Sequence, residues 1–252
     1  MNVPVVIRSC HELAEFHACV ALQREIWGEE PLEVEPATMF VVAAHTGGQV
    51  LGAFAGDTLV GFVLAVAGVR NGRAYLHSHM AGMHDAYRDQ GIGRRLKLFQ
   101  REEALHRGIK LIEWTFDPLE VRNAHFNLNR LGAVCHKYLP NLYGVTTSPL
   151  HRGLRTDRLL AEWYLEVPRV LAAIGEKSTD NIAPSEVSPA GAIRIPVPSL
   201  TPYGAAEDET GMVSLQDRLR DEFTKWFAQG YAATAVAMGE EPAYVLVHRG
   251  RG

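Results

Sequence analysis

Three apolar segments separated by two tight turns place the strongest constraint on how this chain can fold. The segments cover residues 50–56, 59–69 and 74–84, and Asn71 and Gly72 separate the second from the third. An Asn-Gly pair between two apolar runs is the strongest short-range signal for a β-hairpin, because both residues tolerate the left-handed conformation that a type I′ turn requires. The sequence therefore predicts an antiparallel meander of three strands at this point.

The segments around this meander alternate between the periods of strands and helices. Four helices are predicted. The first follows a capping-box spacing at Ser9–Glu12, the second starts at Pro36, the third runs from Leu96 to Arg107, and the fourth from Asp117 to Gly132. Together these elements predict an α/β (α+β) fold in which helices flank a mixed, mostly antiparallel sheet. The further strands are predicted at residues 3–9, 109–116, 133–139 and 158–167.

The composition of the chain changes near Pro168, which predicts three parts. Residues 1–168 form the main domain, residues 169–191 a linker rich in Pro, Ser and Ala, and residues 192–252 a small α/β extension of a strand, a helix and a hairpin. Ser214 and Asp217 are expected to cap the helix of the extension. Its apolar stripe is too large to leave in water, so we expect it to complete a core across a two-fold homodimer rather than within one chain. The stripe consists of Leu215, Leu219, Phe223, Trp226 and Phe227.

Charge and cysteine usage exclude several classes of protein. The net charge of −4 gives the chain no global attraction for nucleic acid or an anionic membrane, so neither is expected as a partner. The spacing of Cys10, Cys19 and Cys135 fits neither a disulfide framework nor a zinc site, which suits a reducing compartment. The N-terminal residues do not resemble a signal peptide, and no apolar run is long enough to span a membrane. We therefore expect a cytoplasmic protein.

A helix start that breaks the local rules follows the third apolar segment directly. Gly91 and Gly93 open the helix, with Arg88 before them and Arg94 and Arg95 after them, although a cap normally prefers Ser, Asp or Asn and the first turn prefers acids. A helix N-terminus offers N–H groups and positive potential, and glycines let an anion approach the backbone. The stretch predicts a phosphate or diphosphate site. A tight turn with solvated arginines is the alternative.

Two common phosphate-binding motifs do not match this stretch, because it lacks both the third glycine of a Rossmann fingerprint and the Gly-Lys-Ser/Thr of a P-loop. Residues 88–93 instead resemble the R/Q-x-x-G-x-G/A signature of the GNAT superfamily of acyl-CoA-dependent N-acyltransferases. The order of elements over residues 3–167 also resembles the GNAT fold, and residues 123–133 are similar to its next helix. Residues 114–127 resemble a bacterial subgroup of predicted acetyltransferases with a C-terminal extension.

The resemblance implies an enzyme that moves an acyl group from acyl-CoA to the amine of a small metabolite, such as an amino acid. The transferred group can be acetyl or succinyl, since the resemblance does not choose between them. It implies that the amine attacks the thioester directly in a ternary complex. It also implies acyl-CoA as a co-substrate and no metal. A β-bulge is implied near Gly82, with the pantetheine arm paired to backbone beyond it. The expected CoA-binding residues are Met83, Arg88, Asp89, Gln90, Gly91, Ile92, Gly93, Arg94, Arg95, Asn123 and Asn127.

Acyl transfer to an amine requires a group that accepts a proton from the attacking nitrogen. The strands beside the implied cleft offer Glu113, His79 and His77 for this role, and each has a purely structural role as its alternative. The two histidines could instead bind a metal, although no third ligand has suitable spacing. Cys135 is a weak candidate for an acyl-carrying nucleophile, because no neighbour in sequence would lower its pKa.

The group that protonates the leaving thiolate is less clear from the sequence. The tyrosine that the GNAT resemblance implies is absent, and Leu128 stands at its expected position. Tyr143, Tyr138 or solvent are the candidates to replace it. The missing tyrosine also keeps open a non-catalytic acyl-CoA-binding or sensing module, which would release no CoA thiol with any amine. A nucleotide-binding protein outside the family is a third hypothesis, and it predicts that ATP or NAD binds at least as tightly as CoA.

Overall fold

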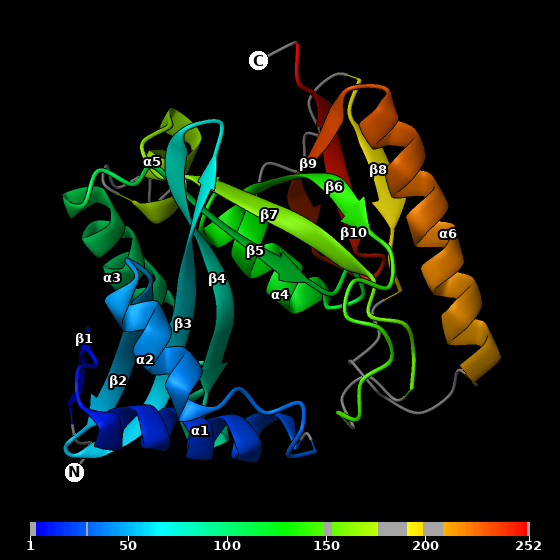
Figure 1. The fold of residues 1–252 in the computed structure, drawn as a ribbon. Coiled ribbons are helices and arrows are strands. Elements are labelled where there is room, and N and C mark those ends of the chain that lie inside the picture. The colour runs from blue at the N-terminus through cyan, green and yellow to red at the C-terminus, as the bar shows by residue number, and fades with distance from the viewer. Residues whose placement is uncertain (1–3, 29, 149–152, 176–190, 199–208, 251–252) are drawn as a thin grey trace. The chain divides into compact units, whose positions relative to one another are not determined.

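The computed structural model describes residues 4–28, 30–148, 153–175, 191–198 and 209–250. The chain forms two compact units (Figure 1). Unit 1 consists of Met1–Glu113 and Thr146–Arg152, and unit 2 of Trp114–Val145 and Gly153–Gly252. The predicted division into a domain, a linker and an extension stays a prediction about what folds independently.

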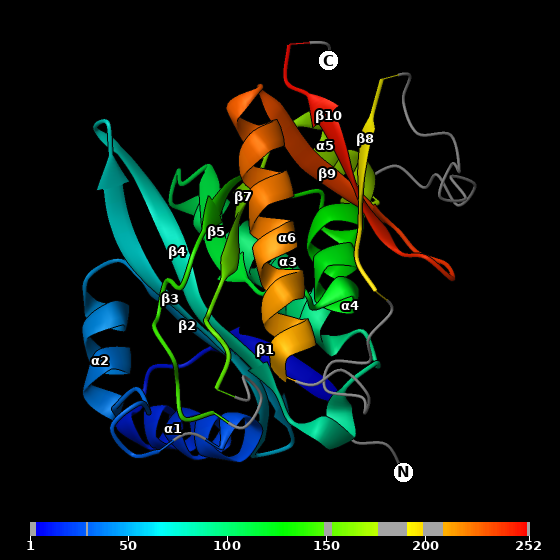
Figure 2. The same ribbon diagram turned by 90° about the vertical axis from the view of Figure 1, so that its right-hand side faces the viewer.

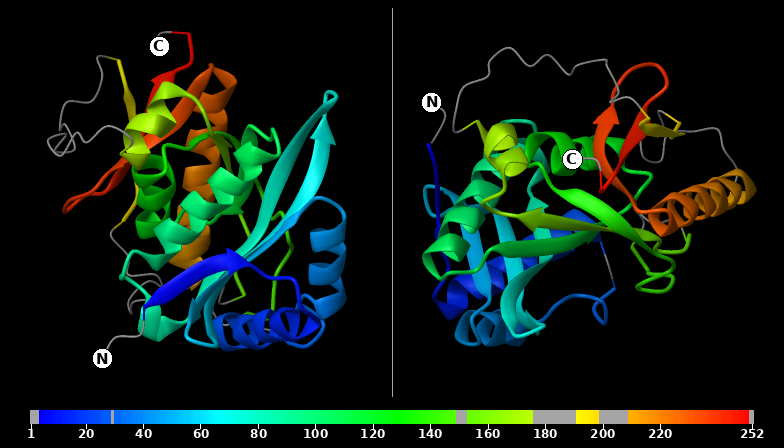
Figure 3. Two further views of the ribbon diagram at one scale, coloured as in Figure 1. Left: turned by 90° about the vertical axis from the view of Figure 1, so that its left-hand side faces the viewer. Right: turned by 90° about the horizontal axis from the view of Figure 1, so that it is seen from above.

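Unit 1 is built on the predicted antiparallel meander. Asn71 and Gly72 adopt left-handed conformations, with φ of 51° and 73°, and confirm the hairpin turn at the tip of the long projecting ribbon in Figure 3. A fifth strand adds in parallel through the pairs Leu76–Ile112 and His77–Glu113. In order across the sheet, the strands are β1 (Val5–Ser9), β2 (Gln49–Ala55), β3 (Thr58–Arg70), β4 (Arg73–Met83) and the start of β5 (Leu111–Phe116).

Helices cover both faces of this meander. On one face, Phe62 and Leu64 of β3 pack with the side chains of α1 (Leu13–Trp27) and α2 (Ala37–His45). On the other face, Val63 of β3 packs with Ile92 and Leu96 of α3 (Ile92–His106). Because successive side chains of a strand point to opposite faces, β3 contributes to both apolar clusters. A short 3₁₀ turn, η1 (Asp85–Tyr87), connects β4 to the loop before α3.

The start of α1 corrects the predicted capping box at Ser9–Glu12. Ser9 pairs with Leu51 in the β1–β2 ladder and therefore belongs to the strand. The box forms three residues later, where the carboxylate of Glu15 accepts hydrogen bonds from the backbone N–H groups of His11 and Glu12 at 2.7 and 3.0 Å. The acid of the box is thus in the first turn of the helix, where the helix dipole favours it.

Unit 2 contains a sheet that the C-terminal strands extend. Strand β6 (Val134–Leu139) pairs with β7 (Arg158–Tyr164) on one side and with β9 (Tyr231–Ala237) on the other, both antiparallel, so the extension continues the sheet of the preceding residues. The hairpin predicted near the C-terminus is confirmed as β9 and β10 (Ala243–His248). In order across the sheet, the strands are the end of β5, β7, β6, β9, β10 and β8 (Ile193–Pro196).

The helices of unit 2 differ from the sequence prediction at three places. The helix expected up to Gly132 is a short α4 (Val121–His125) that continues as a π-helical turn, η2 (Phe126–Arg130). A helix α5 (Pro168–Ile174) occupies the start of the predicted linker, whose residues 176–190 lie outside the described part of the chain. Helix α6 (Glu209–Ala228) begins before the predicted cap at Ser214. Asp217 does not cap it, and its carboxylate instead accepts a hydrogen bond from Arg155 at 2.7 Å.

The apolar stripe of α6 is buried within one chain, which corrects the expectation that a dimer covers it. Helix α6 lies along the C-terminal strands (Figure 2), and the ring of Phe223 stacks on Tyr138 and meets Tyr244 edge-on at centroid distances of 5.9 and 5.0 Å. The hydroxyl of Tyr244 in turn donates to the carbonyl of Pro118 at 2.8 Å. The stripe therefore gives no reason to expect a homodimer. Of its residues, Leu215, Leu219, Phe223 and Phe227 are buried, and Trp226 is half-buried.

We expect Phe223→Ala to lower the free energy of unfolding by about 3–5 kcal/mol, as truncation of a fully buried aromatic side chain does. Met238 is 52% exposed and provides the control, because Met238→Ala should change stability by no more than about 0.5 kcal/mol. Chemical denaturation of the full chain measures both values. Equal stabilities of the two variants would show that α6 does not belong to this core.

No helix in the described part of the chain is both long and apolar enough to cross a membrane.

Candidate active site

The loop before α3 has the backbone geometry of an anion cradle. Asp89 and Gly91 adopt left-handed conformations with φ of 58° and 74°, and Gly91 is the N-cap of α3. The N–H of Arg95 is the donor that returns to the carbonyl of Gly91, so the N–H groups of Ile92 and Gly93 precede it at the positive end of the helix. Within the described residues, a Cβ built on Gly91 or on Gly93 would meet no atom within 4 Å.

This open space explains why Gly93 is informative. Gly91 needs its left-handed φ, which accounts for a glycine there without any ligand. Gly93 lies in the first turn of α3 without a left-handed φ and without a close neighbour, so neither backbone strain nor packing in the described structure requires a glycine at this position. A diphosphate that approaches the backbone closely would require it. The residues present therefore fit the pyrophosphate of CoA.

Two of the arginines predicted to hold the anion have structural contacts in this state. The guanidinium of Arg88 forms an ion pair with Asp85 at 2.8 Å, and that of Arg95 donates to the carbonyl of Val5 at 2.8 Å. The side chain of Gln90 likewise donates to the carbonyl of Ala86 at 2.8 Å. These contacts order the loop, which leaves backbone N–H groups as the main donors of the cradle.

A β-bulge lies at His79 and not near Gly82, where the sequence analysis expected it. Leu64 of β3 pairs with Met80 but the next residue, Ala65, pairs with Ser78, so His79 is the extra residue of β4. The bulge changes which face the strand presents, since Ser78 contacts α3 whereas Met80 packs with α1 and α2. Gly82 has a packing reason instead, because a Cβ there would lie 2.8 Å from Ile26.

Glu113 is held in an ion-pair cluster that makes it a poor proton acceptor. Its two carboxylate oxygens accept hydrogen bonds from Arg70 at 2.8 and 2.9 Å, and the Nδ1 atom of His77 lies 3.6 Å from one of them. Burial alone would raise the pKa of this carboxyl, but His77 and Arg70 outweigh burial and keep the pKa below its ordinary value. The structure thus brings Glu113 and His77 together with an arginine that the sequence analysis did not single out.

His79 has a separate carboxylate partner. Its Nε2 atom lies 2.9 Å from Oε1 of Glu35, which belongs to the connection between α1 and α2. A carboxylate only accepts hydrogen bonds, so Nε2 carries the hydrogen and Nδ1 is the basic nitrogen of the neutral ring. About 30% of each side chain is exposed, so the pair is accessible. The sequence did not indicate Glu35 as a site residue, because it lies 44 positions from His79 along the chain and no local pattern predicts their contact.

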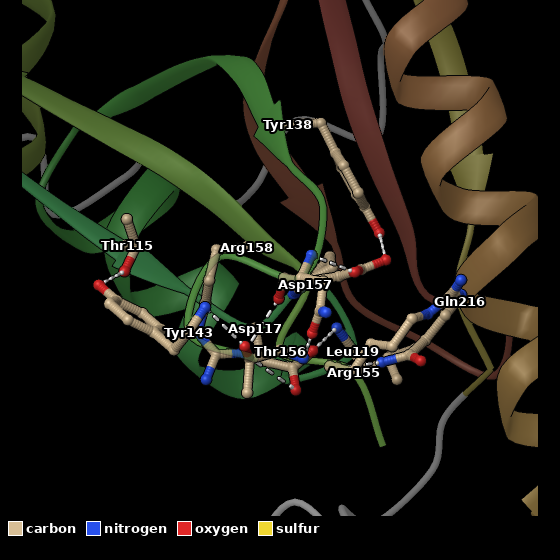
Figure 4. Close-up of polar contacts among 12 residues, drawn as sticks. Thr115, Asp117, Leu119, Tyr138, Tyr143, Arg155, Thr156, Asp157, Arg158 and Gln216 are labelled. Carbon is tan, nitrogen blue, oxygen red and sulfur yellow. Dashed lines mark hydrogen bonds and ion pairs between the residues drawn. The ribbon is translucent and has the colours of Figure 1, made fainter. Parts of the chain in front are cut away.

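The remaining candidates belong to unit 2, and Figure 4 shows the contacts of Tyr143 and Tyr138. The hydroxyls of Tyr143 and Thr115 are 3.0 Å apart, and Tyr143 is 47% exposed. Tyr138, the alternative acid, instead donates to Asp157 at 2.8 Å, and burial raises the pKa of its hydroxyl. Leu128 is fully buried and carries no proton to give.

Asn123 and Asn127, predicted to reach the pantetheine, contact each other on the α4–η2 segment at 3.4 Å. Cys135 is fully buried, and burial raises the pKa of its thiol, which does not suit a nucleophile. Among the described residues, no group of three His, Cys, Asp or Glu side chains is arranged to hold a metal ion.

A buried lysine next to the bulge was missed by the sequence analysis. Lys97 of α3 is 6% exposed, and its Nζ atom donates to Oε1 of Gln100 at 2.6 Å and to Oγ of Ser78 at 3.3 Å. Burial lowers the pKa of this ammonium to about 7. The signal in the sequence was the helical spacing of Lys97 and Gln100 with Ala104, which places two polar residues on the inward face of α3.

The comparisons with known proteins identify the family. The model of the acetyltransferase (GNAT) family matches residues 15–132. A chain of the NatC complex bound to Gag peptide and CoA has a TM-score of 0.52 at 14% identity, over 64% of this chain and 98% of that one. Arabidopsis thaliana NAA60 in complex with acetyl-CoA has a TM-score of 0.52 at 14% identity, over 64% of this chain and 99% of that one. Arabidopsis thaliana Naa50 in complex with a bisubstrate analogue has a TM-score of 0.50 at 16% identity, over 63% of this chain and 97% of that one.

At these identities the solved structures share the fold with this chain, and the family model adds the family itself. No curated protein sequence matches the chain. Residues 15–132 of the chain form a domain that matches the GNAT acetyltransferase family. The chain is an acyl-CoA-dependent N-acyltransferase, as the predicted signature at residues 88–93 implied, and this confirms the class of enzyme.

Gly93→Glu tests the cradle without straining the fold. Glutamate is a better helix former than glycine and is favoured in the first turn, so the melting temperature should stay the same or rise. The carboxylate would meet the diphosphate, and we expect CoA affinity to fall about 100-fold or more. Gly93→Ala is the matched control and should lose less. Isothermal titration with CoA measures both, and unchanged affinity of the glutamate variant would refute the cradle.

The buried lysine predicts a pH dependence of stability. Between pH of about 7 and about 10.5 the unfolded chain keeps a proton that folded Lys97 has lost, so unfolding takes up a proton and stability rises with pH. We therefore expect the stability of the native chain, relative to Lys97→Met, to rise by up to about 5 kcal/mol across this window. Urea denaturation at several pH values measures the difference. A difference that is flat with pH would show that Lys97 titrates normally.

Proposed function

We propose that this enzyme transfers an acetyl group from acetyl-CoA to the primary amine of a small molecule such as an amino acid, by direct attack in a ternary complex. The observation that carries the proposal is the arrangement of β4, which places a bulge with an accessible histidine–carboxylate pair on the strand that leads into the anion cradle. Transfer of a succinyl group, or transfer to a protein N-terminus, are outcomes that the experiments below would reveal.

The cradle and the bulge together fix where the thioester lies in this proposal. The pyrophosphate rests on the N–H groups at the start of α3, and the pantetheine arm follows β4 from Met83 back toward His79. The β4–β5 ladder consists of the pairs at Leu76 and His77, so the arm would pair with backbone of β4 beyond that ladder. The extra residue of a bulge has backbone groups outside the regular ladder, and these provide donors for the thioester carbonyl.

His79 is the proposed proton acceptor for the attacking amine. An imidazole nitrogen can accept a proton from an amine, whereas the Glu113 carboxyl is locked by Arg70 and has a lowered pKa. Glu35 fixes the ring and its tautomer, and it stabilises the imidazolium that forms. His77, beside Glu113, has no comparable short contact with a carboxylate, at 3.6 Å. The amine nitrogen, oriented next to the thioester, attacks the carbonyl carbon as His79 takes its proton.

A small acceptor is supported by a closed contact within unit 1. Thr147 accepts a hydrogen bond from the N–H of Glu30 at 3.1 Å and donates its own N–H to the carboxylate of Glu33 at 3.0 Å. Ser148 donates to the carbonyl of Trp27 at 2.9 Å. These bonds join residues 147–148 to the α1–α2 connection that also carries Glu35. An extended peptide passing between the two segments would have to break them, whereas a small amine would not.

His79→Gln tests the proposed base. The amide keeps the size and polarity of the ring without its basicity, so we expect kcat to fall about 100-fold while the KM for acetyl-CoA changes little. Glu35→Gln should give a smaller loss in kcat, because the ring stays in place without its anionic partner. His77→Gln is the control on the same strand. A larger loss in His77→Gln than in His79→Gln would move the role to His77.

The acceptor class is tested by measuring release of free CoA thiol with amino acids, polyamines, amino sugars and peptides with a free N-terminus. We expect turnover with at least one small amine and none with the peptides. Turnover with peptides alone would contradict the small-molecule proposal and leave the enzyme class intact. Turnover with succinyl-CoA but not with acetyl-CoA would correct the acyl group. Thr147→Ala should reduce the preference for small amines over peptides, because it removes the hydrogen bond between Thr147 and Glu30 that helps to hold the two segments together.

A further inference from the structure

The proposed reaction leaves one proton unassigned. When the tetrahedral intermediate collapses, the C–S bond breaks and the sulfur leaves with its electron pair as a thiolate, which must be protonated for efficient departure. Leu128, at the position where the GNAT resemblance implied a tyrosine, is fully buried and cannot supply this proton. Tyr138 is tied to Asp157 and to the core around Phe223. Of the donors named from the sequence, Tyr143 and solvent remain, and the structure adds a further one.

A polar cluster lies under β4 on the face opposite to the His79–Glu35 pair. Its centre is Ser78, which immediately precedes the bulged residue and points toward α3 because of the bulge. Nζ of Lys97 donates to Oγ of Ser78 at 3.3 Å, and Gln100 lies against both. Gln49 of β2 supports the cluster, because its amide donates to the carbonyl of Gln100 at 3.1 Å and to the carboxylate of Glu103 at 2.8 Å.

We propose that Lys97 supplies the proton that neutralises the CoA thiolate, and that Ser78 passes it on. The proposal places the CoA sulfur against the hydroxyl of Ser78, which is 5% exposed and lies next to the bulge where the thioester is proposed to bind. Lys97 does not contact the sulfur in this proposal. Its hydrogen bond to Oγ orients the hydroxyl of Ser78, and its ammonium supplies the proton that replaces the one Ser78 gives up. This inference rests on the proposed function, because the bulge marks the thioester only if acyl-CoA binds along β4.

The step balances in atoms and charge. The amine proton goes to Nδ1 of His79 as the C–N bond forms. As the C–S bond breaks, the Ser78 hydroxyl proton goes to sulfur and an Nζ proton of Lys97 goes to Ser78. The products are the amide and CoA with a free thiol, and the enzyme is left with a charged His79 and a neutral Lys97. Exchange of one proton between these groups through solvent restores both, so no oxidant, metal or further reactant is needed.

The burial of Lys97 makes a purely structural role expensive. An ammonium removed from water costs far more than an apolar side chain of the same length, so methionine would stabilise this position better. Burial lowers the pKa of Lys97 to about 7. A buried lysine can therefore give up a proton near neutral pH, which an exposed lysine does not do readily. A group that lowers stability and is poised to lose a proton fits a site kept for chemistry.

The kinetic test is a double-mutant cycle in the full chain, with acetyl-CoA and the best small amine of the panel. We expect Lys97→Met and Ser78→Ala each to lower kcat about 100-fold, with the KM for acetyl-CoA changed less than threefold. Because the two residues act in series, the double variant should lose no more than either single one. Lys97→Met should also be at least as stable as the native chain at pH 7, which a structural role would not allow.

Three kinetic outcomes would overturn the proposal. These are additive losses in the double variant, an effect on KM alone, and a larger loss of kcat in Tyr143→Phe than in Lys97→Met, which would assign the proton to Tyr143. The expected result is a loss below threefold in Tyr143→Phe.

A binding test needs no acceptor and separates this proposal from the proposed function. Isothermal titration compares CoA with desulfo-CoA, which lacks the sulfur. We expect the native chain to bind CoA about tenfold more tightly, and the difference to vanish in both Lys97→Met and Ser78→Ala. Equal affinity for the two ligands in the native chain refutes the contact with sulfur, even if the enzyme turns over. A difference that depends on Lys97, together with no turnover for any small amine, would refute the proposed acceptor and keep the sulfur contact.

Discussion

The one-residue shift in the β3–β4 ladder is the constraint on which the candidate site depends. Without it, Ser78 and Met80 would lie on the same face of β4, because side chains alternate with a period of two. With His79 inserted between them, Ser78 faces the polar cluster on α3 and Met80 joins the apolar cluster under α1 and α2. The strand thus presents a buried lysine cluster on one face and an accessible histidine on the other within three consecutive residues. A regular strand could not bring both groups so close to one point of the backbone.

The parts of the structure that local chemistry controls were predictable from the sequence. Asn71 and Gly72 fixed the hairpin because few residues tolerate their backbone conformations. Gly91 and Gly93 indicated the predicted cradle because a helix start normally has a polar cap and acids in its first turn instead of two glycines. The C-terminal hairpin was predicted from two apolar segments, residues 231–238 and 243–249, on either side of a Gly-Glu-Glu-Pro stretch. In each of these cases, the information lies within a few neighbouring residues.

The parts that depend on partners distant in sequence were not predictable. The bulge lies at His79 because both faces of β4 must match helices far along the chain, and nothing in residues 78–82 alone distinguishes that position from Gly82. The pairing of His79 with Glu35, and the capture of Glu113 by Arg70, join residues over 40 positions apart. The cover of the α6 stripe was assigned to a second subunit because the sequence does not show that β9 extends the strand order beside β6.

The C-terminal strands have a consequence for how the sheet of unit 2 ends. An exposed strand edge is a template for pairing with another molecule, and proteins blunt such edges with short strands, charges and prolines. Strand β6 pairs with β9, and β10 and β8 continue the sheet beyond it. The sheet then ends at β8, which has only four residues, carries Arg194 and stops at Pro196, with Pro198 close behind. The last strand of this sheet thus has the features that natural proteins use to discourage pairing at an edge.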